Sequence, residues 1–184
     1  MADQEDGELV RRAKGGDAEA FGGLVERHMR GVYALAYSFT QNHADADDLA
    51  QEAFLRAYRA LGSFRERSSF RTWLYRIAAN ACINHLSRGA ARPESLEEVA
   101  APSNAIGPAE AASLSELEQR VAEVAAQLPA NLRAALHLVV QQGLSHRDAA
   151  EVMGCTKAAV AWRVFRAREL MMERLGPFLP DKAE

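Results

Sequence analysis

Residues 45–88 have the sequence DADDLAQEAFLRAYRALGSFRERSSFRTWLYRIAANACINHLSR, which contains two amphipathic helical patterns of opposite charge. The first pattern, over 45–61, has four carboxylates against two arginines, whereas the segment 63–92 has six arginines against one glutamate. Apolar residues recur at three- and four-residue steps in both, which is the spacing of a buried helix face. An acidic helix beside an arginine-rich helix that bears aromatic residues indicates one surface for a protein and another for nucleic acid.

The rest of the chain has the same helical character. Ala, Leu, Glu and Arg dominate its 184 residues and alternating β-branched runs are missing, which predicts an all-α fold. We expect a short helix over 8–14, a second helix capped by Asp17, and a cap at Ser68 or Ser69 for the helix that ends near residue 87. With the acidic helix, these form a first helical domain over residues 6–92.

The composition changes after this domain. Between residues 93 and 118 there are six glutamates, three prolines and no lysine or arginine. This pattern predicts an acidic, flexible linker over 93–112. The residues alone allow two interpretations, a solvated tether that repels itself or a tether that lies in a basic channel of a partner.

A second small helical domain is predicted over residues 113–178, and it ends in a helix-turn-helix. Ser145 and Thr156 are expected to cap its last two helices. A helix-turn-helix needs a small residue where the helices cross, a residue tolerant of a left-handed backbone, and a branched apolar residue that faces the core. These positions are filled in order by Ala150, Gly154 and Val160. Six basic residues against four acidic ones over 146–174 favour contact with phosphates.

Composition and spacing disfavour several other classes of protein. The two cysteines stand 73 positions apart without a CxxC partner, which favours buried apolar roles and no metal site. No window resembles a membrane span, and the acidic N-terminus does not resemble a signal peptide, so we expect a cytoplasmic protein. No paired carboxylates, nucleophile–base set or phosphate-binding loop stands out. We therefore predict no catalytic residues and no cofactor.

The combination of these modules resembles the bacterial RNA polymerase sigma factors of the sigma-70 family, in the extracytoplasmic-function (ECF) group. The resemblance covers nearly the whole chain and is carried by DAEAFGGLVERH (17–28), DADDLAQEAFLRAY (45–58), SFRTWLYRIAANACINHL (69–86), LPANLRAALHLVVQQGLSHRDAAEVMGC (128–155) and VAWRVFRAREL (160–170). It implies a region 2-like domain followed by a region 4-like domain. It further implies a factor that recruits core RNA polymerase, recognises the −10 and −35 promoter elements, aids promoter opening and is held inactive by an anti-sigma factor.

In this family the acidic helix docks on the clamp helices of the polymerase β′ subunit, and the β subunit is a further partner. The implied core-polymerase-binding residues are Asp45, Asp48, Gln51 and Glu52. Carboxylates that face a basic partner give steering and register more than affinity. Taken alone, these acids fit an alternative explanation as well as they fit docking on the polymerase: they match the dipole of a helix N-terminus and form a solvated face.

The loop 63–69 and the helix after it correspond to the part that melts and binds the −10 element. The implied −10 DNA-binding residues are Arg65, Arg67, Arg71, Tyr75, Arg76, Asn80 and Asn84. The arginines suit phosphates and the asparagines suit base edges. The spacing of Trp73 places it in the core, whereas Tyr75 lies nearer the polar face and stays open for base stacking. Relatives often have aspartate where this chain has Asn84.

The helix-turn-helix corresponds to the reader of the −35 element in the major groove. The implied −35 DNA-binding residues are Arg147, Thr156, Lys157, Ala158, Ala161, Arg163 and Arg166. Many relatives have Gly-Thr where this chain has Ala158-Ala159, which affects the details of −35 contact and not the docking. We expect Trp162 to be half-buried.

Two other functions compete with this interpretation. One is a sigma-mimicking adaptor that sequesters an anti-sigma factor, which would not need the basic loop and helix with Arg65 and Arg67. The other is a helix-turn-helix repressor whose first domain dimerises, which the polar face over 45–52 makes less suitable.

Overall fold

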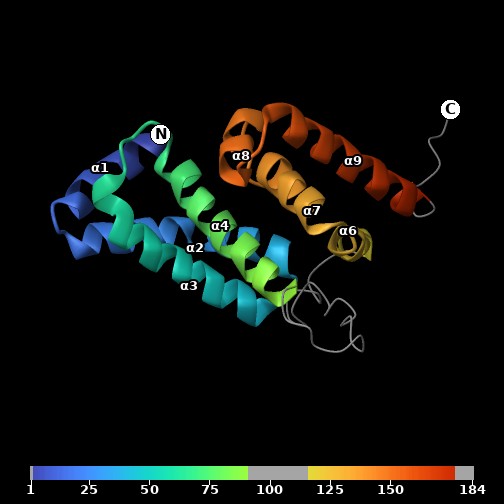
Figure 1. Cartoon of the computed structure of the whole chain (residues 1–184), viewed down its shortest axis with the longest axis horizontal. Helices are drawn as coiled ribbons and strands as arrows, with labels where there is room; N and C mark the ends of the chain where they lie inside the picture. Colours follow the sequence, from blue (N-terminus) through green and yellow to red (C-terminus); the bar gives the residue numbers. More distant parts are fainter. Residues whose placement is uncertain (1, 91–115, 177–184) are drawn as a thin grey trace.

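The computed structural model describes residues 2–90 and 116–176, and all its regular elements in these ranges are helices (Figure 1). The N-terminal group comprises α1 (Ala2–Lys14), α2 (Ala18–Thr40), α3 (His43–Ala60), the 3-10 turn η1 (Leu61–Ser63) and α4 (Phe70–Ala90). The C-terminal group comprises α6 (Glu116–Ala126), α7 (Ala130–Leu136), the π-helical turn η2 (His137–Gln141), α8 (His146–Met153) and α9 (Lys157–Leu175). The all-α prediction of two small helical domains is confirmed. The predicted linker and the domain boundaries at residues 92, 113 and 178 lie outside the described residues.

Side-chain caps explain where most of these helices begin. Asp17 accepts a hydrogen bond from the Ala20 amide, and Ser69 accepts one from Thr72, each at 3.1 Å. Ser145 and Thr156 cap α8 and α9 in the same way. These four caps satisfy amides that the first helical turn leaves without a partner, and each was predicted from the sequence.

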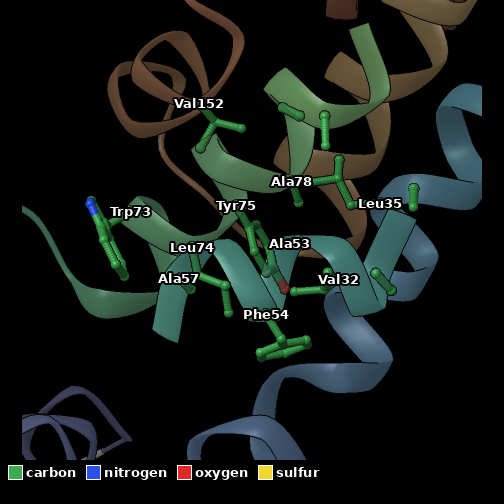
Figure 2. Packing of buried hydrophobic residues seen from close by; sticks show 14 of the residues in the cluster. Val32, Leu35, Ala53, Phe54, Ala57, Trp73, Leu74, Tyr75, Ala78 and Val152 are labelled. Atoms are coloured by element: carbon green, nitrogen blue, oxygen red, sulfur yellow. The ribbon is translucent and has the colours of Figure 1, made fainter. Parts of the chain in front are cut away.

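The first domain packs α2, α3 and α4 around one apolar core. Figure 2 shows part of this core, in which Val32 and Leu35 from α2 meet Ala53, Phe54 and Ala57 from α3 and Leu74 from α4. The small alanines let the helices approach closely. Trp73 is 8% exposed and belongs to the same cluster, which confirms its predicted core position.

The helix α1 covers this core, and a buried hydrogen bond attaches it to α2. Asp6 is only 3% exposed, and its carboxylate lies 2.8 Å from Nε2 of His28. The helix expected over 8–14 did not include Asp6, so this contact was not predicted. The structure begins α1 at Ala2, so the acidic N-terminus is helical.

The core continues from the first domain into the second without a break. Ala134, Leu138, Val152 and Val160 belong to the same buried cluster as the residues of α2 to α4. Helix α8 lies beside the N-terminal half of α4 in Figure 1, and Val152 reaches the cluster in Figure 2. The two domains therefore form a closed arrangement with an apolar contact between them, here called the seam.

The helix-turn-helix has the geometry that its sequence predicts. Gly154 adopts a left-handed backbone with φ of 61°, and its amide donates to the Ala150 carbonyl. Ala150 is 7% exposed and Val160 is fully buried, so both face the core as expected. Cys82 is likewise buried, which confirms its apolar role, and burial raises the pKa of its thiol to about 12.

Candidate polymerase-binding and promoter-binding surfaces

The acidic face of α3 points away from the core. Asp48 and Gln51 are exposed, whereas Asp45 and Glu52 are partly covered. Glu52 accepts a hydrogen bond from Arg56 at 2.6 Å, and Asp45 lies 3.6 Å from His85. Asp48 makes no ion pair among the described residues. It is therefore the carboxylate of this set that is most available to an outside cation.

Leu55 belongs to this face and was missed by the sequence analysis. It follows Asp48 by two helical turns, and 58% of its surface is exposed. The sequence already indicated that Leu55 is exposed, because this leucine falls outside the helical spacing of the buried residues of α3. An exposed leucine beside carboxylates and Gln51 is typical of a protein-binding surface with an apolar centre and a polar rim.

The loop between η1 and α4 is anchored at its base by aromatic rings. Phe64 and Phe70 pack on Trp73, with ring centroids 4.9 and 5.7 Å from it. Lys14 of α1 donates to the Phe64 carbonyl at 2.7 Å and lies over the Phe64 ring. A rigid base of this kind fixes the position of the loop.

Two arginines project from this anchored loop. Arg65 and Arg67 are both exposed and make no ion pair among the described residues. Asn80 and Asn84 are exposed further along α4, on the face that also carries Arg76. These positions suit a polyanionic strand that runs from the loop along the helix.

Tyr75 is a correction to the sequence analysis. It was placed near the polar face and kept open for base stacking, but it is only 2% exposed (Figure 2). Its hydroxyl donates to Oε1 of Gln142 in the second domain at 2.8 Å. Burial raises the pKa of this phenol. The helical pattern of the first domain could not reveal this contact, because the partner lies 67 positions away.

Two neighbouring arginines of the predicted −10 set also turn toward the second domain. Arg71 donates to the Gln142 carbonyl at 3.3 Å, and Arg76 lies 3.5 Å from Glu151 of α8. The predicted −10 residues therefore fall into two groups in the structure. Arg65, Arg67, Asn80 and Asn84 face solvent, whereas Arg71, Tyr75 and Arg76 contact the second domain.

Arg133 of α7 makes hydrogen bonds across the seam. It donates to the carbonyls of Ser38 at 2.5 Å and Phe39 at 3.3 Å, at the end of α2. It also donates to Ala126 and Leu128 in its own domain. One guanidinium therefore satisfies the last carbonyls of two helices from different domains, and its burial lowers its pKa.

The predicted −35 residues surround the N-terminal half of α9. Arg147, Thr156, Lys157, Ala158 and Ala161 are exposed. Arg163 is half-buried, with Nη1 3.3 Å from Sγ of Cys155, so it packs against the turn. Arg166 is half-buried too and pairs with Glu169 at 2.5 Å.

Trp162 is a second correction. It was expected to be half-buried, but 61% of it is exposed. The apolar side of α9 is occupied by Val160 and Val164, and Trp162 lies on the opposite side. Phe165 is similarly exposed, at 65%, and was missed by the sequence analysis.

Comparison with known proteins agrees with this geometry. Residues 24–92 match the family model "Sigma-70 region 2", and residues 118–171 match "Sigma-70, region 4". The chain is 41% identical to the RNA polymerase sigma-H factor of Pseudomonas aeruginosa, over 98% of this chain and 99% of that protein. It is 38% identical to the ECF RNA polymerase sigma-E factor of Escherichia coli K12, over 93% and 94% of the two chains. The chain belongs to the ECF sigma factors of the sigma-70 family.

Two solved structures resemble this ECF sigma factor across both of its domains. One is the sigma factor RpoE in complex with the anti-sigma factor NepR from Bartonella quintana, with a TM-score of 0.74 and 28% identity, covering 86% of this chain and 98% of that one. The other is CnrH in complex with the cytosolic domain of CnrY, with a TM-score of 0.69 and 31% identity over 94% and 98%. Alignments this long span both helical groups.

Within the described ranges, none of the helices of this ECF sigma factor is long and apolar enough to cross a membrane.

Proposed function

We propose that this ECF sigma factor binds core RNA polymerase through the exposed face of α3 and positions it on a promoter through α4 and α9. The observation that carries the proposal is the separation of one acidic surface from two cationic ones on a rigid helical scaffold. Asp45, Asp48, Gln51 and Glu52, with Leu55 at the centre, provide the protein-binding surface. The factor acts in the cytoplasm, where the polymerase is, and it contributes no catalytic group of its own.

Promoter binding is divided between the two domains, residues 6–92 and 113–178. Arg65 and Arg67 hold backbone phosphates of the opened −10 strand, and Asn80 and Asn84 contact its bases. The helix-turn-helix inserts α9 in the major groove of the −35 element, and residues 93–112 connect the two domains. The exposure of the loop arginines favours this function over a sigma-mimicking adaptor.

The closed arrangement has a consequence for promoter binding. Arg71, Tyr75 and Arg76 contact the second domain; Tyr75 is buried and Arg71 partly covered, whereas Arg76 stays exposed. We propose that the seam opens when the factor joins the polymerase, and that these three side chains then turn to the −10 DNA. The similar structures with an anti-sigma factor and with CnrY support an anti-sigma partner that holds the closed form.

Binding to purified core polymerase tests the α3 surface. Asp48→Arg reverses an exposed charge, and we expect at least a tenfold loss of affinity for the core enzyme, or about 1.4 kcal/mol. Asp47→Arg is the matched control, because Asp47 is also exposed on α3 but lies off the Asp48–Leu55 face. Titration of labelled sigma factor with core enzyme measures both variants. Equal affinity of the two variants would exclude this surface.

A further inference from the structure

The exposed side of α9 is apolar. Its apolar residues stand at the positions where a helix that reads DNA contacts the bases. Helical steps of 100° place Ala158, Trp162 and Phe165 opposite the buried Val160 and Val164. Trp162 and Phe165 are 61% and 65% exposed. Exposed aromatic residues of this size on one face mark a binding surface. They stand in the second and third turns of the helix, after the N-terminal turn that carries Lys157.

The polar side chains that could read bases on this helix are few. Residues 157–175 contain no asparagine, glutamine, serine or threonine, so the helix has no amide to pair with adenine. Arg163 packs against the sulfur of Cys155, and Arg166 pairs with Glu169. Lys157 lies at the first position, close to where a phosphate would be.

Two kinds of major-groove contact remain for this helix. An arginine can bind guanine, and an apolar side chain can contact the 5-methyl group of thymine. Arg166 is the one arginine near the middle of the exposed face of α9 and is therefore the candidate to bind guanine. Trp162 and Phe165 are suited to the second, because both are already exposed and project away from the core.

We propose that Trp162 and Phe165 read the −35 element through the 5-methyl groups of thymines in the major groove. This inference rests on the proposed function, since it requires α9 to enter the groove. Capping of α9 by Thr156 and the basic Lys157 and Arg147 set the helix end against the phosphates. The two aromatic side chains then lie one to two turns deeper, over the base edges.

Replacement of thymine by deoxyuridine tests the inference, because uracil keeps every hydrogen bond of thymine and lacks only the methyl group. The probe is a promoter fragment that the wild-type holoenzyme selects from a random library, with each −35 thymine replaced in turn. Binding of the holoenzyme is measured by fluorescence anisotropy. We expect about a fourfold loss at one or more thymines, the value for one buried methyl group at ~0.8 kcal/mol.

Two alanine variants show which of the two aromatic residues contacts the thymine methyl group. Trp162→Ala or Phe165→Ala should weaken binding to the thymine promoter and abolish the difference between thymine and deoxyuridine at one position. Met172→Ala is the matched control, because Met172 is 60% exposed on the same helix but lies two turns beyond Phe165. It should keep the full difference.

The possible outcomes separate this inference from the proposed function. Promoter-specific binding that is insensitive to every deoxyuridine would overturn the thymine inference alone. Alanine variants that keep the sensitivity, or that lose only binding to a protein partner, would overturn it too and would make the aromatic face a protein-docking surface. A holoenzyme that selects no promoter at all would overturn the proposed function together with the inference.

Discussion

Gly31 is the residue that leaves room for the hydrogen bond between Tyr75 and Gln142 in the seam. It lies inside α2, and a Cβ atom there would overlap the hydroxyl oxygen of Tyr75 and lie 3.3 Å from Oε1 of Gln142. The absence of a side chain therefore makes room for the hydrogen bond between the two domains. This glycine is needed for a close approach and not for its backbone angles.

Gly31→Ala should accordingly loosen the seam. We expect a loss of about 1–3 kcal/mol in the free energy of unfolding, from displacement of a buried tyrosine. Gly22→Ala is the control, because Gly22 lies in the same helix with nothing within 4 Å of an added Cβ. It should gain roughly 0.5–1 kcal/mol from helix propensity. Urea unfolding measures both variants, and a gain in both would mean that Tyr75 is not held as described.

Tyr75 and Trp162 departed from prediction for two different physical reasons. Tyr75 is buried by a contact with Gln142 that no local pattern encodes. Trp162 was expected to be half-buried, whereas its helical phase places it opposite Val160 and Val164 and leaves it exposed. Phase was the better guide for Trp162, and only the tertiary structure could place Tyr75.

At the scale of elements, the loop before α4 is held by a helix from the other end of the first domain. Lys14 of α1 donates to the Phe64 carbonyl and lies 3.2 Å from Glu66, whose backbone has a positive φ. The exposed Arg65 and Arg67 flank this anchored residue. Loss of the lysine would free the loop while the helices stay in place.

Lys14→Met should therefore impair promoter opening and spare polymerase binding. We expect a several-fold decrease in the permanganate reactivity of unpaired −10 thymines, because Arg65 and Arg67 would lose their fixed position. Arg11→Met is the control, since Arg11 is on the same helix and, among the residues that the structure describes, forms its ion pair with Glu8. Normal opening by the Lys14 variant would show that the anchor has no part in strand binding.

Element boundaries were predictable where a local signal exists. Asp17, Ser69, Ser145 and Thr156 are caps in both the prediction and the structure. By contrast, α7 continues into a π-helical turn over His137–Gln141, which was not predicted. That turn lies where His137 is buried against the first domain, so its cause is tertiary and left no pattern in the sequence.

At the scale of the whole molecule, the seam covers part of the proposed DNA-binding surface and leaves the proposed polymerase-binding surface open. The α3 surface and the arginines of the loop are open in the closed arrangement, whereas Arg71 and Tyr75 are not. Arg133 connects the ends of helices from both domains. A polymerase that binds α3 first and separates the domains later would therefore uncover Arg71 and Tyr75 only in the holoenzyme.

Run-off transcription with purified core RNA polymerase on a library of promoter fragments measures directly whether this factor selects promoters. We expect transcripts that appear only when the factor is added, from fragments that share −10 and −35 elements at a fixed spacing. Core enzyme that binds the factor and yields no selective transcript from any fragment would show that it does not act as a sigma factor.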